Sequence, residues 1–162
     1  MWAIGPGGAA PRLALLLAGL LLGPGTAAAD LIGADDLAKI TRMAQGYGSA
    51  SLTADSSGDP MIDGEIDGIV YVVRFYGCTD GMGCSEIQFR AVWTGNDRFD
   101  FADMNEWNRT RRFGKAYLDG RNDPVIEMLV NLHAGVSPQN LADSFEWWHL
   151  VLQGFRDEVI DR

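Results

Sequence analysis

The sequence has few of the residues that usually carry chemistry, with two cysteines and two histidines among 162 residues. It contains neither the lysine-bearing glycine motif of a phosphate-binding loop nor the glycine pattern of a dinucleotide-binding fold. His133 and His149 are not accompanied by a pattern of acidic ligands, so the sequence does not predict a zinc site. We therefore expect no metal, no cofactor and no catalytic residues, and we predict a protein that is not an enzyme.

A periplasmic hydrolase that uses scattered acids and His149 is the alternative function. Ser144 lies near His149 in the sequence, but its helical spacing differs from the strand-to-helix turn that carries a hydrolase nucleophile. The carboxylates are too numerous for counting to exclude a glycosidase pair, and no two of them stand out.

Basic residues are also scarce, since 13 lysines and arginines stand against 22 acidic residues for a formal net charge of −9. Such a surface repels nucleic acid and anionic lipid, so we expect no nucleic-acid partner. One basic cluster stands out: Arg109, Arg111 and Arg112, with Lys115 nearby. A cluster of this kind often pairs with surface acids or with a helix C-terminus. The alternative is an anion-binding or partner-binding site.

Long apolar runs are missing except near the start, where residues 13–22 form a run too short to cross a bilayer. Pro24 and Gly25 break this run, and three alanines at 27–29 offer small residues for cleavage. The pattern is typical of a signal peptide over residues 1–29, cleaved after Ala29, before one domain over residues 30–162. We expect a periplasmic or secreted protein without a stable membrane anchor. An uncleaved anchor is the alternative.

Two cysteines in an exported chain predict a disulfide between Cys78 and Cys84. The alternatives are a metal site or two free thiols. The loop between the cysteines offers only Asp80 as a further ligand, and a catalytic dithiol would be better served by closer spacing at a helix start. We interpret the pair as a clasp at the tip of a β-hairpin.

The hairpin has a register that the apolar pattern supports independently. If Cys78 lies opposite Cys84, then Phe75 faces Ile87 and Val73 faces Phe89, and the odd-numbered residues form one apolar face. Arg74 then falls on the other face, opposite Gln88 and diagonal to Glu86, close enough to Glu86 for a cross-strand ion pair. The Asp67-Gly68 pair predicts a tight turn to a preceding strand, which sets Ile62 against Val73.

The rest of the chain predicts helices at both ends of this sheet. Residues 35–47 and 101–108 have helical periodicity, with Asp100 as a cap and with Phe101, Met104 and Trp107 on one face. Residues 113–118 and 125–132 predict a second hairpin, with Glu127 on its exposed face. From Ser137 onward, an apolar stripe predicts a covering helix: Leu141, Phe145, Trp148, Leu152, Phe155 and Val159. The alternative role for this stripe is a coiled-coil seam in a homodimer.

These elements predict an α+β fold, with an antiparallel sheet of about five strands packed against N-terminal and C-terminal helices in the order α-β-β-β-α-β-β-α.

Three stretches resemble the YbjN domain family: residues 72–78 with Cys84 and 87–89, residues 105–118, and residues 123–128 through Trp148. The resemblance covers about residues 35–159. It implies a fold similar to that of type III secretion chaperones, and the family brings no catalytic set with it. By analogy it implies a binding or assembly role. The leader departs from the cytoplasmic location of many members.

We therefore predict an exported protein that binds an unknown peptide or protein partner in a chaperone-like way. The expected contacts are Met82 in the disulfide loop, Trp147 beside the buried stripe, and the basic cluster of Arg109, Arg111 and Arg112.

Overall fold

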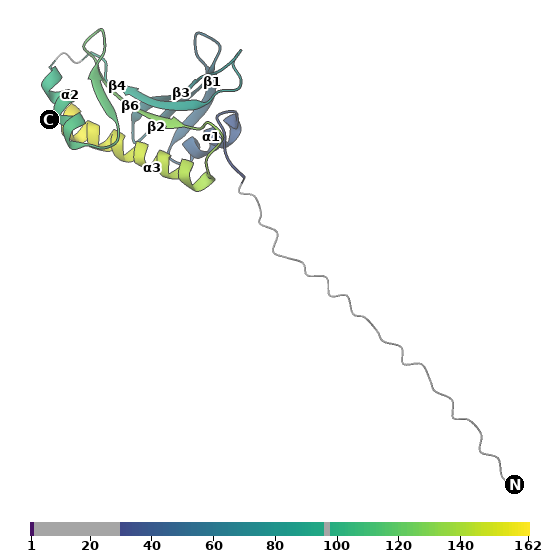
Figure 1. Cartoon of the computed structure of the whole chain (residues 1–162). Helices are drawn as coiled ribbons and strands as arrows, with labels where there is room; N and C mark the ends of the chain where they lie inside the picture. The colour runs from purple at the N-terminus through teal and green to yellow at the C-terminus, as the bar shows by residue number, and fades with distance from the viewer. Residues whose placement is uncertain (2–29, 96–97) are drawn as a thin grey trace.

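The computed structural model describes Met1, residues 30–95 and residues 98–162. Six antiparallel strands form one sheet in the order β1-β2-β3-β4-β6-β5, and α3 lies across one face of it (Figure 1). The helices are α1 (Leu37–Gln45), α2 (Phe101–Thr110) and α3 (Pro138–Phe155), which continues as the π-helical turn η1 (Arg156–Ile160). The strands are β1 (Ser49–Ala54), β2 (Pro60–Ile66), β3 (Ile69–Tyr76), β4 (Glu86–Val92), β5 (Lys115–Leu118) and β6 (Pro124–Asn131). The α+β prediction is confirmed, with one strand more than expected, because residues 49–54 pair with β2.

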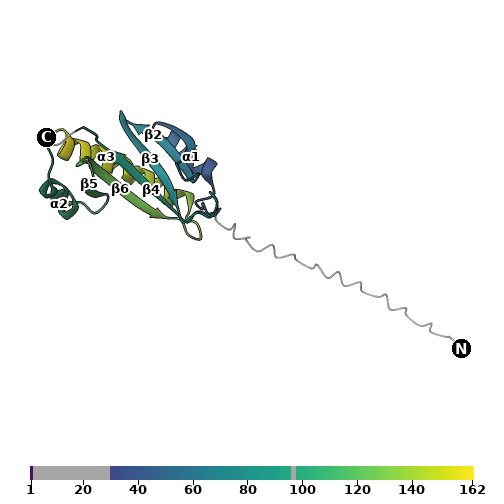
Figure 2. The same ribbon diagram turned by 90° about the horizontal axis from the view of Figure 1, so that it is seen from above.

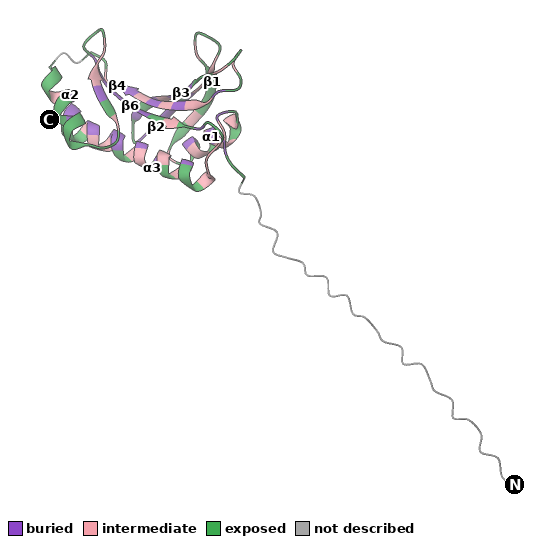
Figure 3. Cartoon of the chain, in the orientation of Figure 1, coloured by how far each residue is buried: buried purple, intermediate pink, exposed green. Residues whose placement is uncertain are grey.

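The predicted hairpin register is confirmed at the centre of the sheet. Phe75 lies opposite Ile87, and Val73 lies opposite Phe89. The Asp67-Gly68 turn sets Ile62 against Val73, as predicted. Buried and partly exposed residues alternate along β3 and β4 (Figure 3), because one face packs on α3 while the other carries the charged side chains.

The hairpin tip is closed by a disulfide between Cys78 and Cys84. The Gly83 N–H donates to Asp35 Oδ1 at 2.9 Å, which ties the tip to the segment just before α1. Closure of so short a loop contributes about 2 kcal/mol to stability by restricting the unfolded chain. The bridge therefore holds the tip in place, while the apolar core supplies most of the folding free energy.

The core is built where α3 meets the sheet, and all six residues of the predicted stripe are buried. Trp148 stacks on Phe89 with ring centroids 5.3 Å apart, and Phe145 meets Phe89 edge-on at 4.9 Å. Ser137 caps α3 by accepting from the Asn140 N–H, and Pro138 occupies the first turn. Because the stripe is covered by the sheet, it is not free to form a coiled-coil seam.

Two predicted side-chain positions are wrong. Phe101 is 71 % exposed, because the Asp100 capping box makes it the first helical residue, before the buried face of Met104 and Trp107 begins. Glu127 is buried, because Arg90 and Lys115 form ion pairs with its carboxylate. Helix α1 is also shorter than predicted.

Arg74 does not form the ion pair with Glu86 that the register suggested. Its Nε atom is buried and has no hydrogen-bond partner among the described residues. Arg74 lies opposite Gln88 in the sheet, as predicted, so the register is right while the expected side-chain pairing is not.

The ends of the described chain lie at opposite ends of the fold (Figure 1). Ile32 pairs with Val136 just before α3, through backbone hydrogen bonds of 2.8 and 3.0 Å. At the other end, Arg162 contacts Asp103 of α2 at 3.3 Å. The predicted signal peptide lies outside the described residues. Within the part of the chain that the structure describes, no helix is long and apolar enough to cross a membrane.

Candidate functional site

A groove lies between the end of α2 and the outer face of α3. We call it the α2–α3 groove, and its volume is about 310 Å³. Arg111, Arg112 and Phe113 line one wall, while Trp147 and Leu150 line the other. Three of the residues predicted to contact a partner, Arg111, Arg112 and Trp147, therefore come together here.

The wall formed by α2 is positioned by Trp107. The indole N–H of Trp107 donates to the Gly114 carbonyl at 3.0 Å, and its ring meets Phe155 edge-on at 5.1 Å. A Cβ at Gly154 would lie 3.4 Å from the Trp107 ring, an ordinary van der Waals contact, so α3 packs directly against Trp107 at this point. The groove wall is thus fixed by core packing.

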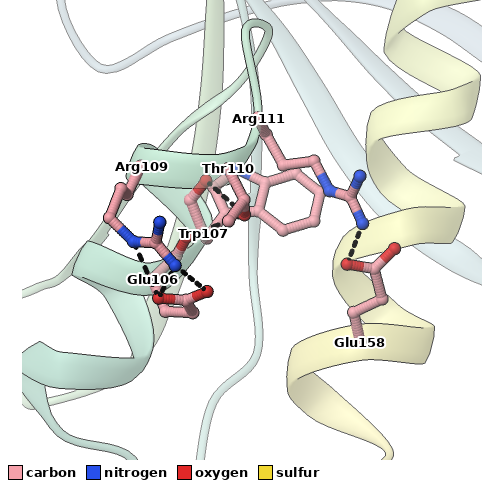
Figure 4. Close-up of polar contacts among 6 residues, drawn as sticks. All are labelled: Glu106, Trp107, Arg109, Thr110, Arg111 and Glu158. Carbon is pink, nitrogen blue, oxygen red and sulfur yellow. Dashed lines mark hydrogen bonds and ion pairs between the residues drawn. The ribbon is translucent and has the colours of Figure 1, made fainter.

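The three arginines of the basic cluster have different surroundings. Arg109 forms an ion pair with Glu106 of its own helix at 2.7 Å and points away from Arg111 (Figure 4). Arg111 reaches across to Glu158, and its guanidinium lies 5.6 Å from the Trp107 ring centroid. The hydrogen bond to Glu158 raises the pKa of Arg111. Arg112 is exposed and forms no ion pair with any described residue.

The apolar part of the groove is an aromatic pair of an exposed Phe113 and a partly buried Trp147. The rings of Phe113 and Trp147 lie 4.4 Å apart at an interplanar angle of 30°. Phe113 is 40 % exposed, and Leu150 beside it is 48 % exposed. Exposed aromatic and aliphatic side chains next to arginine are the composition typical of protein interfaces.

Met82 does not belong to this groove. It is 69 % exposed in the disulfide loop, which the Gly83–Asp35 hydrogen bond ties to the segment before α1. Figure 2 shows α1 and α2 at opposite ends of the fold, so Met82 is remote from Arg112 and Trp147.

Sequence reasoning missed two arrangements that hold β5 and β6 in place. Asn108 holds the edge of β5 by accepting from the Ala116 N–H at 2.8 Å and donating to the Ala116 carbonyl at 2.9 Å. On the sheet face away from α3, the buried carboxylate of Glu127 accepts from Tyr117 and pairs with Arg90 and Lys115. Neither arrangement had a sequence signal, because the first depends on how α2 packs beside β5 and the second on the register of the sheet.

His149, the basis of the hydrolase alternative, lies next to Asp67. Its Nε2 atom is 2.7 Å from Asp67 Oδ2, and Gln153 Nε2 also donates to that oxygen at 2.9 Å. These hydrogen bonds lower the pKa of Asp67, and the bond with His149 has the largest effect. Ser144 instead donates to the Asn140 carbonyl. Among the described residues, His149 has no hydrogen bond to a serine, threonine or cysteine, so the pair lacks a nucleophile.

The described residues contain no group of three or more His, Cys, Asp or Glu side chains placed to hold a metal ion. His133, the second histidine of the sequence, is exposed next to β6, where its backbone N–H donates to the Asn131 side chain at 2.8 Å.

The model of the YbjN family, described as "Putative bacterial sensory transduction regulator", matches residues 36–161. A search of curated proteins finds no significant match. The family match spans the whole described fold from the start of α1 to η1, and it suggests a regulatory or binding role. The chain therefore belongs to the YbjN family.

Proposed function

We propose that this chain is an exported, non-enzymatic protein that binds a peptide or protein partner in the α2–α3 groove. The observation that carries the proposal is the partly exposed Phe113–Trp147 pair beside Arg112. The description of the family as a regulator is consistent with a binding role.

The chemistry of the groove indicates what the partner presents. Phe113, Trp147 and Leu150 offer apolar surface whose burial is worth about 25 cal/mol per Å². Arg112 adds a cation without an ionic partner among the described residues, so it can bind a carboxylate without first breaking an existing pair. We therefore expect a partner segment with an apolar side chain and an acidic residue nearby.

Site-specific crosslinking tests the location of the partner. A photo-crosslinking amino acid is placed at Leu150, and separately at Leu52, which is a similarly exposed leucine on β1. We expect an adduct from Leu150 but not from Leu52, and we expect Trp147→Ala to abolish it. Equal adducts at both positions, or an adduct that survives Trp147→Ala, would contradict a specific site in this groove.

Export is part of the proposal and is tested separately. The apolar leader supports it, and a disulfide persists best in an oxidising compartment. We expect N-terminal sequencing of the periplasmic or secreted protein to begin at Asp30. We also expect its mass to be lower than that of its reduced form by two hydrogen atoms. A full-length chain with two freely labelled thiols in the cytoplasm would contradict export.

A further inference from the structure

Strand β6 has an edge that is only half covered. Strand β5 pairs with β6 from Leu118 opposite Pro124 as far as Lys115 opposite Glu127, and there the pairing stops. Strand β6 continues to Asn131. The backbone of Gly114 has a φ of +79°, a left-handed conformation that turns the chain away from the sheet edge. Residues 128–131 therefore have β4 on one side and, within the described parts of the chain, no strand on the other.

The direction of the hydrogen bonds shows which groups face this open side. The Leu132 N–H donates to Ser85, and the Pro124 carbonyl accepts from Trp93, so even-numbered residues of β6 bond toward β4. Bonding direction alternates along an antiparallel strand. The N–H and C=O groups of Leu129 and Asn131 consequently point to the uncovered edge.

A second hollow of about 330 Å³ runs along the same edge. Its walls are the last residues of β6 and the first half of α3, including Asn140 and Asp143. Phe113 and Trp147 line this hollow as well as the α2–α3 groove, so the aromatic pair joins the two. Leu129 is 55 % exposed beside it.

At the outer edges of β5 and β1, side chains bind some of the outward backbone groups. Asn108 occupies both backbone groups of Ala116 on β5. On β1, the Gln45 side chain donates to the outward carbonyl of Ala50 at 3.1 Å. Open edges invite pairing with another strand, and proteins usually block them.

We propose that an extended peptide with an apolar side chain and one carboxylate adds as a strand to the open edge of β6. The proposal rests on the proposed function and specifies how the partner binds. The peptide backbone pairs with Leu129 and Asn131, an apolar side chain packs on Phe113 and Trp147, and a carboxylate meets Arg112. Asp143, in the half of the hollow formed by the start of α3, repels a second carboxylate there. A four-residue edge buries far less than the roughly 800 Å² per partner of a stable interface, which disfavours a second copy of the chain.

The test uses peptides selected from a phage-displayed library of random 12-residue sequences on the purified protein. Their affinity is measured for the wild type, Leu129→Pro and Leu52→Pro. Each proline removes an outward N–H from an exposed leucine on an edge strand, so Leu52→Pro is a matched control. We expect Leu129→Pro to weaken binding about tenfold or more and Leu52→Pro to change it less than about twofold.

Hydrogen exchange of the wild type gives a second readout that needs no variant. We expect the Leu129 amide to exchange rapidly in the free protein and to be protected by the selected peptide. This measurement decides the question if Leu129→Pro fails to fold.

Other outcomes would overturn strand addition. Unchanged binding to Leu129→Pro, with binding lost in Trp147→Ala, would leave the groove proposal standing without an added strand. A library that yields no peptide while crosslinking at Leu150 still succeeds would have the same meaning. A wild-type dimer that Leu129→Pro converts to a monomer would assign the edge to a second copy.

Discussion

The hydroxyl of Tyr71 is a buried polar group without a hydrogen-bond partner among the described residues. The residue is 1 % exposed, and burial raises the pKa of Tyr71 to about 12. Its ring occupies the space over Gly64, where an added Cβ would lie 2.4 Å from the ring. Tyr71 therefore fills the core at the cost of an unpaired hydroxyl.

We predict that Tyr71 makes the protein sensitive to alkali. The unfolded tyrosine ionises near its ordinary pKa of 10, whereas the folded one stays neutral until about pH 12. Its contribution to stability is therefore complete below pH 10 and is lost as the pH rises through about 12. The free energy of unfolding should fall by about 2–3 kcal/mol across this window.

Urea unfolding between pH 8 and 12 checks this expectation. Tyr71→Phe should remove most of the fall, while Tyr76→Phe, which changes a 39 % exposed tyrosine on the same strand, should leave it unchanged. Equal pH profiles for Tyr71→Phe and the wild type would contradict the assignment. The pKa values of Tyr47 and Tyr117 are also raised, first by burial, and hydrogen bonds with Asp30 and Glu127 raise the pKa values of Lys39 and Lys115, so these groups contribute to the remaining slope.

At the scale of elements, one side chain of α2 forms hydrogen bonds with the edge of the sheet. Asn108 satisfies both backbone groups of Ala116, so a helix residue takes the place of a neighbouring strand. The same helix carries Trp107, whose hydrogen bond to Gly114 sets the point where β5 begins.

We expect Asn108→Ala to lower the free energy of unfolding by about 1–2 kcal/mol, because two hydrogen bonds are lost. Asn105→Ala is the matched control, since it changes the same residue type on an exposed position of the same helix and has the same effect on helix propensity. Chemical denaturation measures both variants. Equal stability of the two would mean that the Asn108 contacts contribute nothing.

The elements also show which parts of the fold the sequence could predict. The central hairpin was predictable because the cysteine spacing and the apolar alternation independently specify one register for Phe75 and Phe89. The burial of Glu127 was not predictable. Strand alternation predicts on which face of the sheet a residue lies, but it does not predict the ion pairs that the residue forms on that face. The predicted position of Phe101 was wrong for a related reason, since helical periodicity does not say at which residue the capped helix begins.

At the scale of the molecule, α3 covers the centre of the sheet, while α1 packs at the end formed by β1 and β2. Leu152 is fully buried on α3, whereas Leu150 on the same helix is 48 % exposed. We expect Leu152→Ala to cost about 2–5 kcal/mol, the range for deleting a buried leucine. Leu150→Ala should stay within about 0.5 kcal/mol of the wild type. Thermal or urea unfolding measures the difference, and similar losses in both variants would contradict the role of α3 as the cover.

The α2–α3 groove shows why the candidate site was only partly predictable. Arg111, Arg112 and Trp147 were chosen for composition alone, and they meet because Gly114 turns the chain and Trp107 packs on Phe155 of α3. Met82 and Arg109 were chosen on the same grounds and lie apart from them. Composition suggested which residue types could contact a partner. Which of these residues lie together in the α2–α3 groove depended on backbone turns and close packing.

The two ends of the described fold lie at different distances from the candidate site, and this decides where a label can be attached. Ile32 is held beside Val136, far from the aromatic pair, whereas Arg162 lies against α2 at Asp103. A fusion or affinity tag following Arg162 would crowd the surface next to Arg111 and Glu158 and would compete with whatever docks there. Immobilisation through the segment preceding Ile32 would leave that surface accessible.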